Sequence, residues 1–217
     1  MKTQILTKKQ LLFLKLFSKS GLNTKFYLSG GTALAEFYIP YRLSDDLDFF
    51  SLDEVVTEEI MIFLKQNKSL LGYESYEFNT SFNRNLFFLK FSDQILKTEF
   101  TYYPFTQIEK PIDHGGVLVD SLLDIAANKL FTIYQKPRAR DFIDLYMTCL
   151  KTGWQINDLI KKTKIKFDVH IDPIKLGSQF LLCTELGDYP KLLIDLENDE
   201  WQNFFLNEAK EIGKEII

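Results

Sequence analysis

Two short stretches near the start of the chain decide its fold: LSGGTALA at residues 28–35 and RLSDDLDFF at residues 42–50. In a β-strand, successive side chains point to opposite faces of the sheet. Asp46 and Asp48 would therefore project from one face, while Leu47 between them points into the core. The apolar pair that closes the second stretch fits a strand in the interior of a sheet. The chain thus presents two carboxylates side by side on an otherwise apolar strand.

Two adjacent carboxylates repel each other unless a positive charge lies between them. A divalent cation is the natural partner, and Mg²⁺ prefers hard oxygen ligands. Two such ions about 4 Å apart can activate an attacking oxygen and stabilise a leaving oxygen in phosphoryl transfer. We therefore predict that Asp46 and Asp48 are catalytic residues that hold one or two Mg²⁺ ions. The alternative is a solvated acidic strand end that binds no ion.

The first stretch supplies a glycine pair between a predicted strand and a predicted short helix over residues 32–38. Glycines have no side chain to block a phosphate, and the backbone N–H groups at a helix start attract anions. We predict that Ser29, Gly30 and Gly31 cradle the triphosphate of a nucleotide. Arg42 and Ser44, just before the carboxylates, are further candidate nucleotide-binding residues. The alternative is an ordinary turn.

Together the two stretches resemble the first motif of the DNA polymerase β-type nucleotidyltransferase superfamily. More narrowly, they resemble the AbiEii/AbiGii family, the nucleotidyltransferase toxins of bacterial toxin–antitoxin and phage-defence systems. The resemblance implies a third carboxylate on a strand beside the first two, and Glu99, in the strand-like run 95–102, is the candidate metal ligand. The alternative is a strand glutamate that pairs with Lys97.

A second pair of stretches, LDIAANKL at residues 123–130 and RARDFIDLY at residues 138–146, resembles later motifs of the same family. The resemblance implies that Lys129 contacts the nucleotide phosphates and that Asp141 or Asp144 is catalytic, with Arg140 as a further nucleotide contact. Asp141 and Asp144 lie three residues apart, so on a helix they share a face. The alternative is a surface ion pair between Arg140 and Asp144.

The chain has 217 residues, 46% of them hydrophobic, which is enough to bury a core and excludes intrinsic disorder. Strand-like runs dominate up to about residue 120. Helical patterns follow, at residues 121–134, 140–150, 157–162, 173–184 and from 199 onward. This segregation predicts an α+β protein. We expect a mixed nucleotidyltransferase sheet flanked by helices over residues 1–120, and a helical domain over residues 121–217 that completes the active site.

Composition narrows the functional classes. The net charge of 26 − 30 = −4 excludes a protein that is polybasic overall. The two cysteines form neither a disulfide framework nor a zinc site. No apolar run approaches the roughly 18 residues of a membrane span. Residues 1–10 lack the apolar run of a signal peptide, so we expect no secretory targeting. We therefore expect a cytoplasmic protein without a membrane partner.

Charge is nevertheless unevenly distributed. Residues 129–166 hold nine Lys and Arg against three Asp, a net charge of +6. The lysine-rich run at residues 161–166 would contact an RNA backbone or simply keep a helix end solvated.

The predicted function is transfer of a nucleoside monophosphate from a nucleoside triphosphate to an acceptor. The resemblance favours an RNA acceptor, such as a tRNA, and a toxin neutralised by a separately encoded antitoxin. Two alternatives stay open. One is a regulatory module that binds a nucleotide without transferring it, and the other is transfer to a small molecule such as an antibiotic.

Overall fold

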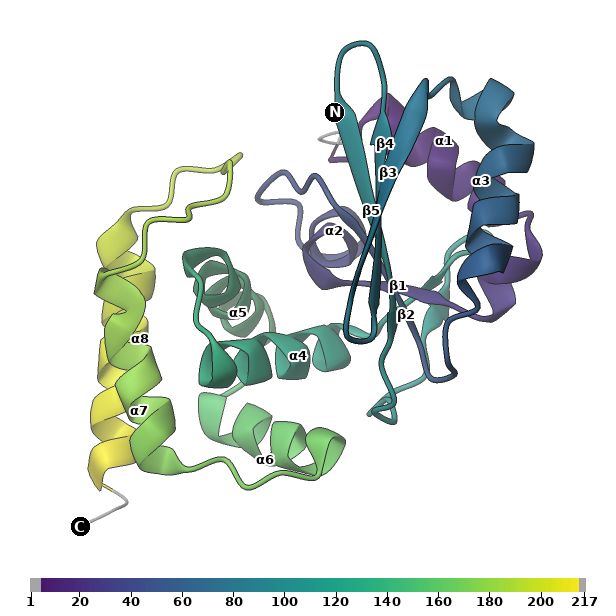
Figure 1. Cartoon of the computed structure of the whole chain (residues 1–217). Helices are drawn as coiled ribbons and strands as arrows, with labels where there is room; N and C mark the ends of the chain where they lie inside the picture. The colour runs from purple at the N-terminus through teal and green to yellow at the C-terminus, as the bar shows by residue number, and fades with distance from the viewer. Residues whose placement is uncertain (1–4, 215–217) are drawn as a thin grey trace. The chain divides into compact units, whose positions relative to one another are not determined.

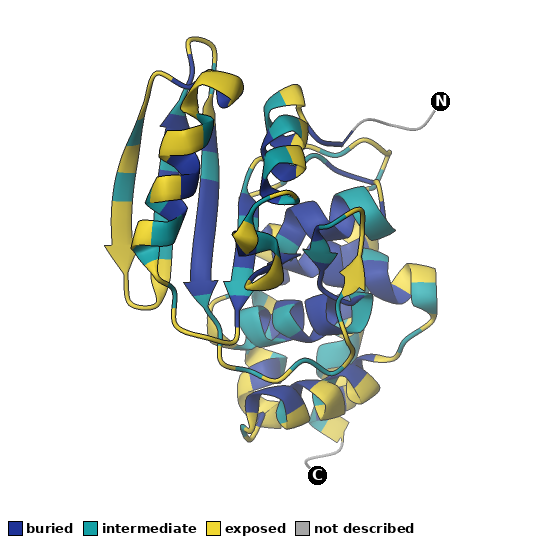
Figure 2. Cartoon of the chain, turned by 90° about the vertical axis from the view of Figure 1, so that its right-hand side faces the viewer, coloured by how far each residue is buried: buried dark blue, intermediate teal, exposed yellow. Residues whose placement is uncertain are grey.

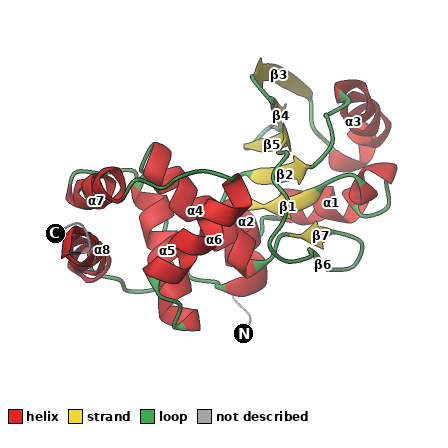
Figure 3. Cartoon of the chain, turned by 90° about the horizontal axis from the view of Figure 1, so that it is seen from below, coloured by secondary structure: helices red, strands yellow, loops and turns green. Residues whose placement is uncertain are grey.

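The computed structural model describes residues 5–214, and the chain divides into two compact units (Figure 1). The first unit comprises the described residues up to Thr106 together with Lys110–Ser121. The second comprises Gln107–Glu109 together with the described residues from Leu122 onward. All the described strands belong to the first unit, and the second is built from helices (Figure 3).

The described strands of the first unit form one mixed sheet in the order β3-β4-β5-β2-β1-β7-β6. In this sheet β2 runs parallel to β5 and antiparallel to β1, while β1 runs parallel to β7. A mixed sheet with helices confirms the predicted α+β class. The strands are β1 (Tyr27–Ser29), β2 (Leu47–Ser51), β3 (Ser75–Ser81), β4 (Arg84–Lys90), β5 (Ile95–Tyr102), β6 (Ile112–Asp113) and β7 (Leu118–Val119).

Three α-helices accompany the sheet in the described part of this unit: α1 (Lys8–Phe17), α2 (Gly30–Ala33) and α3 (Thr57–Leu71). A π-helical turn, Leu34–Tyr38, continues α2. A 3₁₀ turn, Gly21–Thr24, leads into β1. The predicted helix over residues 32–38 is therefore an α-helical turn followed by a π-helical one, and it starts two residues earlier than expected.

An aromatic core lies between the sheet and the pair of helices α1 and α3, which lie side by side (Figure 1). Phe49 of β2 stacks on Phe100 of β5 with ring centroids 4.9 Å apart. Phe17 of α1 approaches Phe49 to 4.4 Å, and Phe63 of α3 meets Phe13 of α1 edge-on at 5.5 Å. Burying such large rings supplies much of the stability of this unit.

The aromatic core also determines where the carboxylates point. Leu47 and Phe49 are fully buried, whereas Asp48 between them is partly exposed, which confirms the predicted alternation along β2. Because strand side chains alternate, Asp48 of β2 and Glu99 of β5 project from the face opposite the aromatic rings. Burial falls toward the edge of the sheet, where β3 is largely exposed (Figure 2).

The second unit contains the helices α4 (Leu122–Gln135), α5 (Ala139–Thr152), α6 (Ile156–Phe167), α7 (Pro173–Leu181) and α8 (Asn198–Lys214). Helices α7 and α8 pack side by side (Figure 1). Their core includes Phe205, whose ring lies 4.7 Å from Phe142 and 5.2 Å from Phe180. Cys149 and Cys183 are buried and free of disulfides. Across residues 5–214, no helix combines the length and apolar character needed to cross a bilayer.

A fully buried ion pair holds the second unit together. Lys166 Nζ of α6 lies 2.7 Å from Asp124 Oδ1 of α4, and neither side chain is exposed. The same carboxylate accepts the backbone N–H groups of Ile108, at 2.8 Å, and Glu109, at 2.9 Å. These bonds explain why Gln107–Glu109 belongs to the helical unit. Because its side chain is buried in this ion pair, Lys166 is not one of the surface lysines that the sequence predicted at residues 161–166.

Candidate active site

The turn between β1 and α2 requires its two glycines. Gly30 has φ +72°, a conformation that favours glycine. A Cβ on Gly30 would meet the Asp48 carboxylate, and a Cβ on Gly31 would meet the Arg42 guanidinium and the Ser44 hydroxyl. The structure therefore brings these predicted site residues together around one turn.

The polar side chains at this turn are engaged within the protein. The Ser29 hydroxyl is buried and donates a hydrogen bond to Asp120 Oδ2 at 2.7 Å. Arg42 is only 4% exposed, and its Nη1 donates to the Leu43 carbonyl at 2.8 Å. The Thr32 hydroxyl donates to the backbone carbonyl of Asp46. The Thr32 bond fixes the turn against the start of β2, and the Ser29 bond ties it to Asp120. Because the Ser29 hydroxyl is engaged in this way, we expect any phosphate contact by Ser29 to use its backbone.

Two of the three predicted metal ligands, Asp48 and Glu99, lie on neighbouring strands, and the third, Asp46, lies next to one of them. In the β2–β5 register, Asp48 is opposite Glu99 and Leu47 is opposite Thr98. Asp46 lies immediately before β2, on the same face as Asp48. Glu99 thus occupies the strand position that the resemblance implied for a third carboxylate.

Two cations balance these carboxylates. Lys97 Nζ lies 2.6 Å from Asp46 Oδ2 and 3.9 Å from Glu99 Oε2. Arg84 forms a bidentate pair with Glu99, its Nε and Nη2 each 2.6 Å from one carboxylate oxygen. The Thr101 hydroxyl also donates to Glu99 Oε1, at 2.9 Å. The partner that sequence reasoning considered for Glu99, Lys97, is therefore closer to Asp46, and Arg84 is the principal partner of Glu99.

These contacts keep Glu99 ionised. Burial acts to raise the pKa of Glu99, but the hydrogen bonds and charge of Arg84 outweigh it, and the pKa lies below its usual range. The hydrogen bond to Glu99 likewise raises the pKa of Arg84, and the charges of Asp48 and Asp46 add to that rise. Glu99 and Arg84 therefore both carry their charges at neutral pH.

The donor chemistry of this cluster suits a divalent cation, because Mg²⁺ prefers carboxylate oxygens. Within the described residues, no three His, Cys, Asp or Glu side chains converge as a ready-made metal site. Two of the candidate ligands are instead paired with side-chain cations: Asp46 faces Lys97, and Glu99 faces Arg84. Side-chain cations here satisfy the same demand for positive charge that a metal ion would satisfy.

A second charged cluster lies in the helical unit, on α4 and α5. Lys129 Nζ lies 2.7 Å from Asp141 Oδ1 and 2.6 Å from Asp144 Oδ2. Both carboxylates are fully buried, and Arg138 Nε adds a second ion pair to Asp141 at 2.6 Å. Asp141 and Asp144 do share a helix face, as their spacing predicts. Both form ion pairs with Lys129, so the geometry does not identify which of the two aspartates is catalytic.

The pKa of Asp141 reflects this surrounding. Burial acts to raise that pKa, but the charges of Lys129 and Arg138 outweigh burial and lower it. Arg140 lies elsewhere, with its Nε 4.0 Å from Asp188 Oδ2. Because Asp144 is fully buried, the alternative of a surface ion pair between Arg140 and Asp144 is wrong.

Sequence reasoning missed two cations at these clusters, Arg84 and Arg138, and it considered Lys97 only as a partner of Glu99. Lys97 lies two residues before Glu99 on one strand, and Arg138 lies three residues before Asp141 on one helix, so spacing alone signalled both. Arg84 carried no such signal, because it meets Glu99 only across the β4–β5 pairing.

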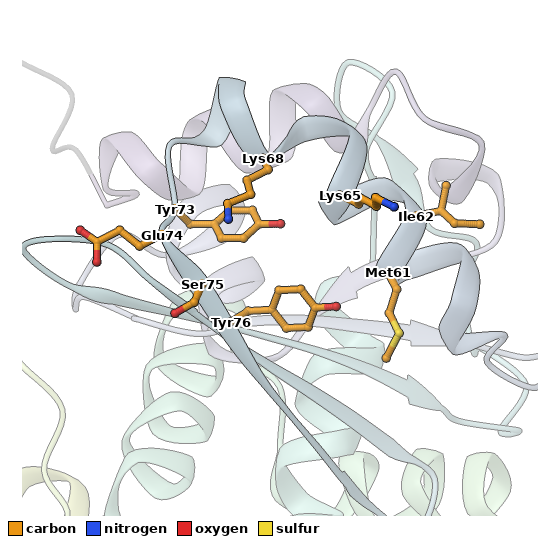
Figure 4. Close-up of a pocket in the computed structure, with 8 residues that line it drawn as sticks. All are labelled: Met61, Ile62, Lys65, Lys68, Tyr73, Glu74, Ser75 and Tyr76. Atoms are coloured by element: carbon orange, nitrogen blue, oxygen red, sulfur yellow. The ribbon is translucent and has the colours of Figure 1, made fainter.

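A groove of about 440 Å³ lies elsewhere in the first unit, between α3 and β3 (Figure 4). Its described lining is Met61, Ile62, Lys65, Lys68, Tyr73, Glu74, Ser75 and Tyr76, and it includes none of the predicted site residues. Helix α3 covers the aromatic face of the sheet, whereas the carboxylates project from the other face. The chemistry of the site therefore resides in the charged clusters, and the groove is separate from them.

The chain matches the model of a family described as "Nucleotidyl transferase AbiEii toxin, Type IV TA system" over residues 11–207. An uncharacterised protein of Aquifex aeolicus (strain VF5) is 32% identical over 149 residues, 68% of each chain. A candidate nucleotidyltransferase of H. pylori has a similar structure, with a TM-score of 0.62, 21% identity and 97% of each chain covered. The JHP933 protein of Helicobacter pylori gives the same TM-score and identity, covering 97% of this chain and 94% of its own.

Proposed function

Because the chain belongs to the AbiEii family of nucleotidyltransferase toxins, we propose that it moves a nucleoside monophosphate from a nucleoside triphosphate to an RNA acceptor in a Mg²⁺-dependent reaction. The observation that carries the proposal is the register of β2 and β5. It sets Asp48 opposite Glu99, with Asp46 on the same face, beside the glycine turn. Hard oxygen donors next to a turn without side chains suit a triphosphate that carries a divalent ion.

In the proposed reaction, an acceptor hydroxyl oxygen forms a bond to the α-phosphorus of the triphosphate. The bond from that phosphorus to the bridging oxygen breaks, pyrophosphate leaves, and the hydroxyl proton passes to water. Asp46, Asp48 and Glu99 would hold Mg²⁺, which when bound supplies charge neutralisation at the triphosphate. Gly30 and Gly31 would let the phosphates approach the backbone closely. Catalysis of this kind rests on positioning and charge stabilisation.

We also propose that Lys129, Asp141 and Asp144 are required for transfer. Lysine is a compact point charge suited to phosphate oxygens. In the structure, the two carboxylates hold its ammonium in one place. Their role would be to orient that charge, so loss of either aspartate should impair Lys129.

An RNA acceptor is supported by the exposed lysines of the helical unit. Lys161 and Lys162 are neighbours on α6 and are both exposed, and clustered lysines attract phosphates. The family description places its members in Type IV toxin–antitoxin systems. We therefore propose that a separately encoded antitoxin neutralises this protein, and that the setting is phage defence in the cytoplasm.

The test is incubation of the protein with each α-³²P nucleoside triphosphate, Mg²⁺ and total bacterial RNA. The variant Asp48→Asn removes one charge from the cluster while keeping the side-chain shape. Asp45→Asn is the matched control, because Asp45 is exposed in the loop just before β2. We expect label in an RNA band with wild type and Asp45→Asn, and more than a hundredfold less with Asp48→Asn, of the order seen when a charge-stabilising group is lost.

Other outcomes would favour the alternatives. Full activity of Asp48→Asn would contradict the metal role of this carboxylate. Nucleotide binding without transfer to RNA or to any small molecule would support the regulatory module. In a parallel incubation with a small-molecule antibiotic in place of RNA, label in the antibiotic but not in RNA would support a small-molecule nucleotidyltransferase. RNA binding whose affinity falls steeply with salt concentration would support a polyanionic acceptor.

A further inference from the structure

We propose that the Lys97 ammonium occupies the position of the divalent ion in the metal-free protein, and that the ion binds by displacing Lys97 from Asp46. This inference rests on the proposed function, because it concerns the same carboxylates. It makes Lys97 a built-in competitor that weakens metal binding until a nucleotide brings the ion to the site.

The first support is the position of the ammonium. Lys97 Nζ lies 2.6 Å from Asp46 Oδ2 and 3.9 Å from Glu99 Oε2, so it lies between the carboxylate that precedes β2 and the carboxylate on β5. Lys97 and Glu99 are two residues apart on β5 and share a face. A cation bridging the oxygens of Asp46 and Glu99 would need the space that this ammonium fills.

The second support is the way Glu99 is held. Its Oε1 accepts hydrogen bonds from both Arg84 Nε and the Thr101 hydroxyl, which use the two lone pairs of that oxygen. Within residues 5–214, its Oε2 accepts one hydrogen bond, from Arg84 Nη2. The remaining lone pair of Oε2 is on the oxygen nearest Lys97. Arg84 and Thr101 therefore act as positioning residues that leave Glu99 one oxygen for a cation.

The third support is the difference between the two cations. Arg84 binds Glu99 through two hydrogen bonds, and its planar guanidinium matches the carboxylate. A metal ion would therefore not readily displace Arg84 from Glu99. Lys97 makes one close contact, to Asp46, through a flexible stem that is partly exposed. Of the two, Lys97 is the cation that a divalent ion can replace without dismantling the orientation of Glu99.

The test measures Mn²⁺ affinity directly, from the electron paramagnetic resonance signal of free Mn²⁺ in the absence of nucleotide. Lys97→Gln removes the competing charge, and we expect about fivefold tighter Mn²⁺ binding, the value of one modest ion pair. Lys90→Gln is the matched control. It removes the same charge from the same face of the neighbouring strand, where Lys90 pairs with Glu77, and we expect less than about a twofold change.

Two further variants keep the outcomes distinct. Lys97→Arg retains the charge and should show no tightening, and Asp48→Asn should weaken Mn²⁺ binding in every background. Tighter binding in Lys97→Gln but not in Lys90→Gln or Lys97→Arg supports the proposal. Equal or weaker Mn²⁺ binding in Lys97→Gln than in wild type overturns the proposal. If Asp48→Asn binds Mn²⁺ as tightly as wild type does, the metal site itself is overturned.

Discussion

Replacing Lys166 by methionine should strongly destabilise the helical unit, because it leaves the Asp124 carboxylate buried without its counter-ion. The Lys166 ammonium lies 2.7 Å from Asp124 Oδ1 with neither side chain exposed. At an effective dielectric constant of about 20, unit charges at that distance attract by roughly 6 kcal/mol. Methionine keeps most of the apolar stem, so the loss is chiefly electrostatic.

The net contribution of the ion pair to the free energy of unfolding is smaller than this attraction, because burying the two charges costs desolvation energy that offsets part of it. Removing one partner of a buried pair typically costs about 3–5 kcal/mol. Two backbone N–H donors, of Ile108 and Glu109, remain on the carboxylate, which favours the lower end, about 3 kcal/mol. For a chain of this size, that loss lowers the melting temperature by roughly 6 to 12 °C.

The assay is urea denaturation followed by tryptophan fluorescence, because both tryptophans of the chain, Trp154 and Trp201, lie in the helical unit. Trp201 is fully buried, so its emission changes when the unit unfolds. The control is Lys161→Met on the same helix, whose partner Asp158 is exposed. We expect that control to lose less than about 0.5 kcal/mol.

The reasoning would be refuted if Lys166→Met lost no more stability than Lys161→Met. A further arm tests the cause. The double variant Asp124→Asn/Lys166→Met no longer buries a net charge, so it should be more stable than Lys166→Met alone. If the double variant were less stable than either single variant, the loss would come from packing and not from an unpaired charge.

Two further predictions concern pH and stability. Burial raises the pKa of Glu208, and Glu211 adds to the rise, so the ionised form destabilises the fold at pH 7. Glu208→Gln should then gain about 0.5 kcal/mol at pH 7 and nothing at pH 4, and a lower urea midpoint at pH 7 would contradict this. The pKa of Asp141 is lowered from an ordinary 3.8, so on acidification the unfolded chain binds that proton first. The contribution of ionised Asp141 to the free energy of unfolding is complete above about pH 5. It is lost as the pH falls through the lowered pKa of the folded state, so urea midpoints should fall from pH 5 to 3. Arg138→Gln should flatten this fall, and an unchanged slope would count against the ion pair as its cause.

The sequence by itself determined the features that depend on the period of one element. Alternation along residues 46–50 was sufficient to send Leu47 into the core and Asp48 to the other face, as the structure has them. The strand predicted at residues 95–102 has the same bounds in the structure, and it carries Glu99 beside Asp48. These features follow from local rules, because successive side chains on a strand must alternate wherever one face is buried.

Helical spacing was informative where both residues of a pair lay inside the predicted helix. Asp141 and Asp144, three residues apart, were expected to share a face, and both hold Lys129. The helix expected at residues 157–162 is Ile156–Phe167 in the structure. Because Lys166 fell outside the shorter helix, its place seven residues after the buried Leu159 went unused, although that spacing indicates the buried face.

Only the tertiary structure decided which charges meet. Arg84 reaches Glu99 because β4 and β5 pair in one particular register, and Lys97 reaches Asp46 because β5 lies parallel to β2. Lys166 finds Asp124 forty-two residues away because α6 packs on α4. A periodic pattern states which face of an element a side chain occupies, but not what lies opposite. The residue that lies opposite depends on strand register and helix packing, which minimise the free energy of the whole fold. The spacing of residues within either element therefore does not indicate it.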